Sequence, residues 1–147
     1  MRILIYIMIF IPVVGYADSY LCVADKASGF QFSESNWDVA NFRTDNTYIV
    51  QSSNIDRFPL QVVKVGDKVP VIMCKEGFNS GGFLYCASGG PLDMLGIVMG
   101  EHFSFNQKSL RFMRVVPRGY VNVVLGNGIS DSESGTPYIE IGKCSQL

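Results

Sequence analysis

The sequence predicts an all-β fold, a small antiparallel β-barrel of lipocalin-like or inhibitor-like shape, with a β-sandwich as the alternative. Short runs of β-branched and aromatic residues recur along the chain, and Gly, Pro, Asn and Asp separate them. No segment beyond residue 17 shows a sustained helical period. About nine or ten short strands in one domain of this size are typical of closed or stacked antiparallel sheets.

Residues 1–17 have the pattern of a secretory signal peptide. Arg2 supplies a positive charge, an apolar run follows, and the small residues Gly15 and Ala17 stand at the positions that signal peptidase reads. An uncleaved anchor is the alternative, but the apolar run is shorter than the roughly 20 residues that cross a bilayer. We therefore predict cleavage after Ala17 and a periplasmic or secreted protein. We expect residues 18–147 to form one disulfide-stapled β domain without a membrane span.

The charge of the mature chain is close to neutral. Arg2 is the only charged residue in the first 17, so 11 of the 12 Lys and Arg remain against 13 Asp and Glu, a formal charge of −2. This balance argues against nucleic acid and anionic membranes, which select basic patches. Basic residues are denser at Lys108, Arg111, Arg114 and Arg118, but aromatic residues alternate with them as in a half-buried strand. We therefore expect no nucleic-acid partner. An anionic protein or glycan stays open as a partner for the face that carries these basic residues.

The four cysteines predict two disulfides, because an even number in an exported chain is typical of a disulfide framework. We favour Cys74 with Cys86, since a central hairpin over residues 69–86 can bring them opposite each other. We favour Cys22 with Cys144, since first and last strands are often neighbours in closed β folds. The spacings are not those of zinc ligands, and the single histidine, His102, is far from any pair, so we expect no metal and no cofactor.

The first half of the mature chain predicts five strands before the central hairpin. Strands are expected at residues 19–24 and 30–33, joined by a turn at 25–29, and then at 37–43, 46–51 and 60–65. Trp37 is predicted to lie in the core. Pro70 cannot donate a ladder hydrogen bond, so the strand that follows it is placed at a sheet edge or a bulge.

The second half predicts a hairpin from residues 103–105 and 110–112, followed by two more strands. A bulge is expected after Met113, because Arg114 occupies a position where the alternation calls for an apolar residue. Strands are expected at 120–125 and 136–141, with an Asn-Gly turn signal at residues 127–128 between them. In the last strand Tyr138 and Glu140 share one face, and the isoleucines between and after them share the other.

Three stretches resemble a group of short exported bacterial and phage-associated proteins. They are the opening YLCVADKASGF at residues 20–30, residues 103–112, and the ending TPYIEIGKC at residues 136–144. The resemblance covers most of the mature chain, apart from residues 88–100. It implies an exported bacterial domain and implies no activity or functional residue.

Catalytic signatures are weak in this sequence. The sequence has no Gly-x-Ser-x-Gly nucleophile motif for which His102 could act as the base. It also has no phosphate-binding or dinucleotide-binding glycine motif. The acids most easily assigned are interpreted as turn residues and solvated faces, although a glycosidase-like pair of carboxylates stays open. They are Asp25, Asp38, Glu76, Glu101 and Glu140.

The segment at residues 88–100 follows neither the strand period nor a good helical period. Its apolar residues either fold onto the domain or form a partner-binding loop, and the candidate binding residues are Leu92, Met94, Leu95 and Met99. We therefore expect a non-catalytic exported binding module that acts on another protein as an inhibitor or immunity factor. The alternatives are a carrier of a small apolar ligand inside a lipocalin-like barrel, and a carboxylate-dependent hydrolase.

Overall fold

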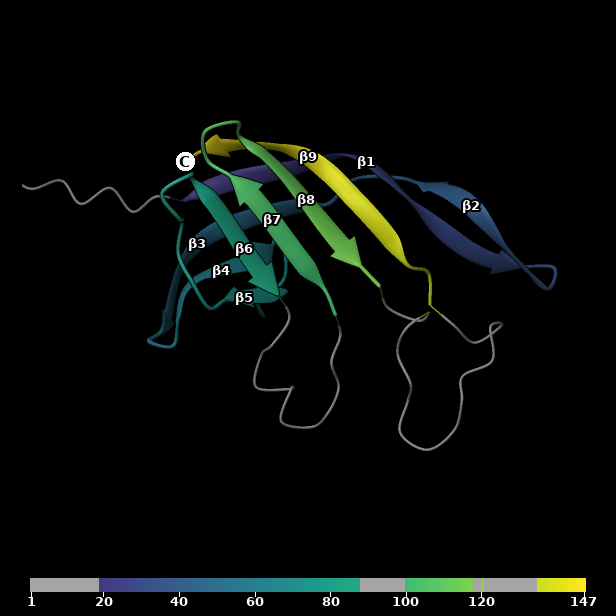
Figure 1. Ribbon diagram of the computed structural model, residues 1–147, viewed down its shortest axis with the longest axis horizontal. Coiled ribbons are helices and arrows are strands. Elements are labelled where there is room, and N and C mark those ends of the chain that lie inside the picture. The colour runs from purple at the N-terminus through teal and green to yellow at the C-terminus, as the bar shows by residue number, and fades with distance from the viewer. Residues whose placement is uncertain (1–18, 88–99, 118–119, 121–134) are drawn as a thin grey trace, which may run out of the picture.

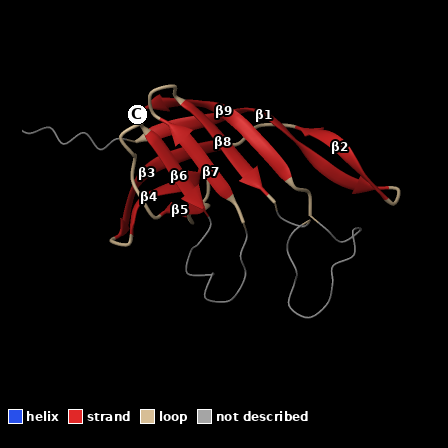
Figure 2. Cartoon of the chain, viewed as in Figure 1, coloured by secondary structure: helices blue, strands red, loops and turns tan. Residues whose placement is uncertain are grey.

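The computed structural model describes residues 19–87, 100–117, 120 and 135–147, and these form strands and loops with no helix (Figure 2). The expected strand at 120–125 and the Asn-Gly turn at 127–128 lie outside the described residues, apart from Tyr120. The strands are β1 (Tyr20–Ser33), β2 (Asn36–Phe42), β3 (Thr47–Ile55), β4 (Phe58–Lys64), β5 (Ile72–Cys74), β6 (Phe83–Ala87), β7 (His102–Asn106), β8 (Arg111–Val116) and β9 (Tyr138–Gln146).

The strands form a single antiparallel sheet that curls until it is nearly closed, which confirms the predicted small β-barrel (Figure 1). The order across the sheet is β5-β4-β3-β1-β9-β8-β7-β6, and β2 pairs with the outer part of β1. The first and last strands are therefore neighbours at the middle of the sheet. The short strands β5 and β6 are its two edges. The strand after Pro70 was predicted to lie at an edge or a bulge, and β5 confirms the edge.

Alternate residues of these strands point inward and fill the barrel with one continuous apolar cluster. Its largest fully buried members, Tyr48, Phe103 and Phe105, are at most 1% exposed. Rings of Phe103 and Phe112 stack with centroids 5.2 Å apart, and Tyr20 packs edge-on against Phe105 at 4.8 Å. The interior is thus occupied by the protein's own side chains.

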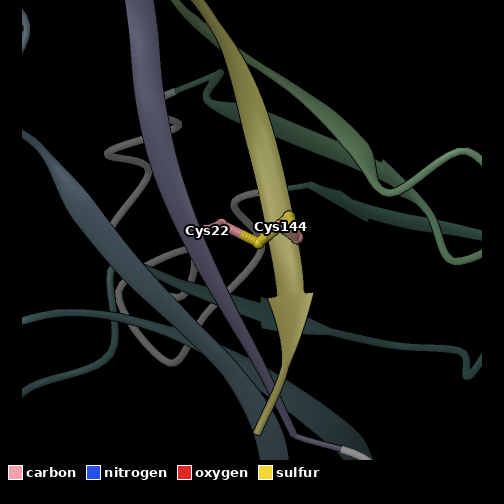
Figure 3. Close-up of a disulfide and its surroundings, with 2 residues drawn as sticks. All are labelled: Cys22 and Cys144. Carbon is pink, nitrogen blue, oxygen red and sulfur yellow. A yellow bond between two sulfur atoms is a disulfide. The ribbon is translucent and has the colours of Figure 1, made fainter.

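Both predicted disulfides are present. Cys22 and Cys144 are directly opposite each other in the β1–β9 ladder, where their side chains meet on the inner face (Figure 3). Cys74 and Cys86 connect β5 to β6 and so join the two edges of the sheet. All four cysteines are buried in the core cluster.

The central hairpin expected over residues 69–86 is wrong, although its disulfide is right. β5 pairs with β4 and β6 pairs with β7, so the two cysteine-bearing strands belong to different ladders. The connection between them packs Phe78 against the rings of Tyr20 and Phe105. The connection crosses from one edge of the sheet to the other, and Phe78 packs against the core on the way. A tight hairpin would instead have paired the two strands with each other.

The hairpin expected at residues 19–33 is also wrong, because β1 runs through the proposed turn as one strand. The register against β9 shifts between Ala24 and Lys26, so the turn-forming Asp25 is absorbed as a β-bulge. Gly29 serves close packing instead of a turn, since a Cβ there would lie 2.1 Å from the carbonyl oxygen of Pro137. β1 can therefore pair with β9 on one side and with β3 and β2 on the other.

Two further expectations are corrected. No bulge interrupts the β7–β8 ladder, whose register is regular from His102↔Val115 to Asn106↔Arg111, and Arg114 points into the barrel. Trp37 lies outside the core cluster: it is half-buried on β2, where its ring meets Phe32 and Tyr120. The β1–β2 ribbon that carries it extends beyond the rest of the barrel (Figure 1).

Candidate functional site

The candidate binding residues named from the sequence, Leu92, Met94, Leu95 and Met99, lie outside the described residues. The ends of their segment are placed: Ala87 closes β6, and β7 begins at His102, directly opposite Ala87. The segment therefore connects two neighbouring antiparallel strands. Three candidate sites can be described: the pair of His102 with Tyr85, a buried charged cluster, and a groove on the outside of the barrel.

His102 is paired with Tyr85 on the outer face. Their rings stack with centroids 5.6 Å apart, and the Tyr85 hydroxyl lies 2.8 Å from Nδ1 of His102. This contact occupies one imidazole nitrogen and holds the ring against the sheet. Among the described residues no three His, Cys, Asp or Glu side chains gather as metal ligands do.

Arg114 is held inside the barrel by two glutamates that the sequence alone suggested were solvated. Glu101 and Glu140 are each 1% exposed, and Arg114 is 6% exposed. The guanidinium Nη2 lies 2.8 Å from Glu101 Oε2, and Nη1 lies 3.5 Å from Glu140 Oε2. Burying a charge is costly unless it is paired, and these contacts pair the guanidinium with two carboxylates, although the buried Nε of Arg114 has no hydrogen-bond partner among the described residues.

Tyr48 connects the two charged partners within this cluster. Its hydroxyl donates to Glu140 Oε2 at 2.6 Å and accepts from Arg114 Nη1 at 2.7 Å, and Asn46 donates to Glu140 Oε1. Burial, together with the hydrogen bond to Glu140, raises the pKa of Tyr48 well above its ordinary value. Burial alone would lower the pKa of Arg114, but its hydrogen bond to Glu101 and the charge around it raise that pKa. Tyr48 therefore keeps its proton and Arg114 its charge at neutral pH.

The buried cluster is a structural feature of the core and offers no open catalytic site. Each of its carboxylates has a cationic partner, and their 1% exposure leaves no path for a substrate in solution. A hydrolase needs an acid and a base that contact the substrate. Asp25, Asp38 and Glu76 are exposed, as expected for turn and surface residues.

An apolar groove lies on the outside of the barrel, where β8, β9, β1 and β2 are side by side. We call it the outer groove; its volume is about 590 Å³. Cross-strand register aligns Val115, Ile139 and Ser28 in one row, because directly opposed residues share a face. The lining comes from residues 26–30 of β1, Val39 and Asn41 of β2, residues 115–117, residues 137–139, and Ile141 of β9.

A second hollow of about 410 Å³ continues the outer groove along the ribbon. It shares Phe30 and Pro137 with the outer groove and adds Trp37 and Tyr120. Phe30 is directly opposite Val39 and Phe32 is directly opposite Trp37, so one face of the ribbon carries all these apolar side chains. An antiparallel sheet usually turns polar residues outward, and contiguous exposed apolar surface of this kind marks a binding site.

A strand edge runs beside this apolar surface. β9 pairs with β1 as far as Gly29↔Tyr138, and the amide of Phe30 then donates to the carbonyl of Pro137 at 3.0 Å. Beyond that point, within the described residues, β1 has a ladder partner only in β2. The backbone of Phe32 therefore presents its polar groups on the side where β9 has ended, next to the hollow lined by Trp37.

Sequence reasoning missed this surface because it placed the polar face of β9 outward. Glu140 points inward, so Ile139 and Ile141 point outward and are 46% and 48% exposed. The signal was present in Cys144, which has the same parity as Glu140 and is fixed inside the barrel by its disulfide.

Comparisons of the chain with protein-family models, with curated proteins and with solved structures find no match. No helix among the described residues has the length and apolar character of a membrane span. Two disulfides are consistent with an exported protein.

Proposed function

We propose that this protein is a non-catalytic exported module that binds an extended apolar segment of another protein, in the manner of an inhibitor or immunity factor. The observation that carries the proposal is the outer groove, with the hollow that continues it, beside the edge of β1 at Phe32, where no described strand follows β9. An extended segment can pair its main chain with this edge while alternate side chains enter the groove, which is the geometry of β-strand addition.

The filled interior supports a binding surface on the outside of the barrel. Tyr48, Leu84 and Phe103 are fully buried in its centre, where a lipocalin-like carrier would keep space for its ligand. The outer groove has the volume and apolar lining that also suit a small apolar molecule, so a carrier that binds on its outer face is the second candidate. The backbone edge favours the peptide, because it offers hydrogen bonds that an apolar molecule cannot use.

A matched pair of isoleucine variants tests the proposal. Ile139 lies in the outer groove and is 46% exposed, whereas Ile55 ends β3 away from it and is 52% exposed. Ile139→Glu places a charge among apolar contacts and should abolish partner binding, while Ile55→Glu should leave it unchanged. Both variants should unfold within about 1 kcal/mol of the wild type, because both positions face solvent.

The measurement is capture of extended peptides from a displayed library by the mature chain, followed by titration of the selected peptides. Trp37 is the only tryptophan and lines the hollow that continues the outer groove, so its fluorescence reports a segment that reaches this hollow. Alternating apolar sequences that shift this fluorescence and lose affinity with Ile139→Glu would support the proposal. Equal loss with both variants, or a native mass spectrum showing a bound small molecule in place of peptide binding, would overturn it.

A further inference from the structure

The outer edge of β2 is a second open strand edge, on the side of the ribbon away from β9. Among the described residues β2 pairs with β1 alone, in a regular register from Ala27↔Phe42 to Ser33↔Asn36. Exposed edges are usually protected by Lys, Pro or a bulge. β2 reads NWDVANF, with no Lys, Arg or Pro and no shift of register, and Val39 at its centre is 74% exposed.

The ribbon's turn shows which backbone groups face this edge. Glu34 and Ser35 both have positive φ, 47° and 71°, as in the two-residue type I′ turn that closes a hairpin. Such a turn makes Ser33 and Asn36 a hydrogen-bonded pair, and the pairs then alternate along the ladder. The amides and carbonyls of Trp37, Val39 and Asn41 therefore point away from β1.

The contact between Phe30 and Pro137 supports this assignment independently. Phe30 is opposite Val39, so the same alternation requires the amide of Phe30 to point away from β2. It does so, donating to the Pro137 carbonyl at 3.0 Å.

We propose that this edge pairs with the same edge of a second copy of the chain, antiparallel about a twofold axis through Val39. In this register Val39 faces Val39 of the second copy, and Trp37 faces Asn41 on each side of the axis. Every outward amide and carbonyl of these three residues then has a partner, because each directly opposed pair exchanges both hydrogen bonds.

Charge favours this register over the one shifted toward the turn. Asp38, the only charged residue of β2, falls opposite Ala40 of the second copy. A shift that moves the axis to Asp38 would oppose two carboxylates and leave the outward groups of Asn41 unpaired, which is unfavourable. On the face that carries Phe30, Val39 and Trp37 would pack beside Val39 and Asn41 of the second copy. An isologous contact of this kind closes as a dimer.

Val39→Pro tests the proposal in the intact mature chain. Proline removes the central outward amide, but the ladder to β1 uses the amides of Asp38 and Ala40 and is spared. Sedimentation velocity and native mass spectrometry should show a dimer for the wild type, and a dissociation constant at least about tenfold higher for Val39→Pro. Val39→Thr keeps both the amide and a β-branched side chain, so it should remain dimeric.

Cysteine substitution tests the axis and does not depend on the proline variant folding. Val39→Cys places two thiols directly opposite each other at the spacing of an antiparallel pair, so oxidation should yield a covalent dimer. Asp38→Cys points to the other face, opposite Ala40 of the second copy, and should yield little. Ile139→Glu should still dimerise, which separates this inference from the groove proposal. A wild-type chain that stays monomeric at millimolar concentration, or equal cross-linking at both positions, would overturn it.

Discussion

At Arg114 the barrel holds a guanidinium between two buried carboxylates, Glu101 and Glu140, and its removal would take this cation away from both of them. Arg114→Met keeps much of the side-chain volume, so the change isolates the charge. We expect it to lower the free energy of unfolding by about 3–5 kcal/mol, the usual cost of breaking a buried pair from one side. Urea denaturation of the mature chain measures the difference.

Arg111 is the matched control, because it lies on the same strand but is exposed. Arg111→Met should change stability by no more than about 0.5 kcal/mol. Equal effects at the two positions would mean that the cluster contributes no more than surface charge.

Tyr48 gives the same cluster a dependence on pH. Its folded-state pKa is raised, so at alkaline pH the unfolded chain gives up this proton first. The stability that comes from keeping it is present below about pH 10 and is lost as pH rises beyond that value. Tyr48→Phe should therefore flatten the alkaline decline and lower stability at neutral pH by about 1–3 kcal/mol, since Glu140 loses a donor.

Unfolding by urea at a series of pH values checks this expectation. Tyr85→Phe, at an exposed tyrosine, is the control and should keep the wild-type decline. An unchanged alkaline slope in Tyr48→Phe would contradict the assignment.

At the scale of the strands, the pattern of short apolar runs and turn residues predicted the fold class, and both cysteine pairings were right, although Cys74–Cys86 was argued from a hairpin that does not form. The pattern failed where one residue carries two signals. Asp25 and Gly29 have turn chemistry, yet both sides of β1 are paired, so the gain from ladder hydrogen bonds outweighs the local preference for a turn. In a strand that is buried on one face, alternate residues face the core. When one of these inward residues is charged, polarity alone assigns the wrong set of residues to the core.

The inward faces of β8 and β9 could have been phased from fixed points. Cys144 shares parity with Glu140, and Phe112, opposite Phe105, shares parity with Arg114. Either residue, taken as facing the core, predicts that Arg114 and Glu140 point inward. The isoleucines of β9 then point outward, where they line the outer groove. The edge of β2 was beyond sequence reasoning, because it depends on which strand lies beside the ribbon, a long-range property.

For the whole molecule, closure of the barrel depends on two disulfides that act at different places. Cys22–Cys144 lies within a ladder in the middle of the sheet and spans 122 residues of sequence, whereas Cys74–Cys86 spans 12 and joins the sheet's two edges. In the loop-entropy description, their removal costs about 5 and about 3 kcal/mol respectively. For local opening of the sheet we expect the opposite order, with the larger effect from loss of Cys74–Cys86. Without Cys22–Cys144, β1 and β9 are still joined by their ladder hydrogen bonds.

We therefore expect Cys22→Ala with Cys144→Ala to lower the global free energy of unfolding more than Cys74→Ala with Cys86→Ala does. The second pair of changes should instead accelerate amide hydrogen exchange in β5 and β6, with little change in β1 and β9. Urea denaturation measures the global effect, and exchange followed by mass spectrometry measures the local one in the same two variants. Unchanged exchange at both edges after loss of Cys74–Cys86 would show that packing around Phe78 alone keeps the barrel closed, since Phe78 is the remaining contact in that connection that reaches the core.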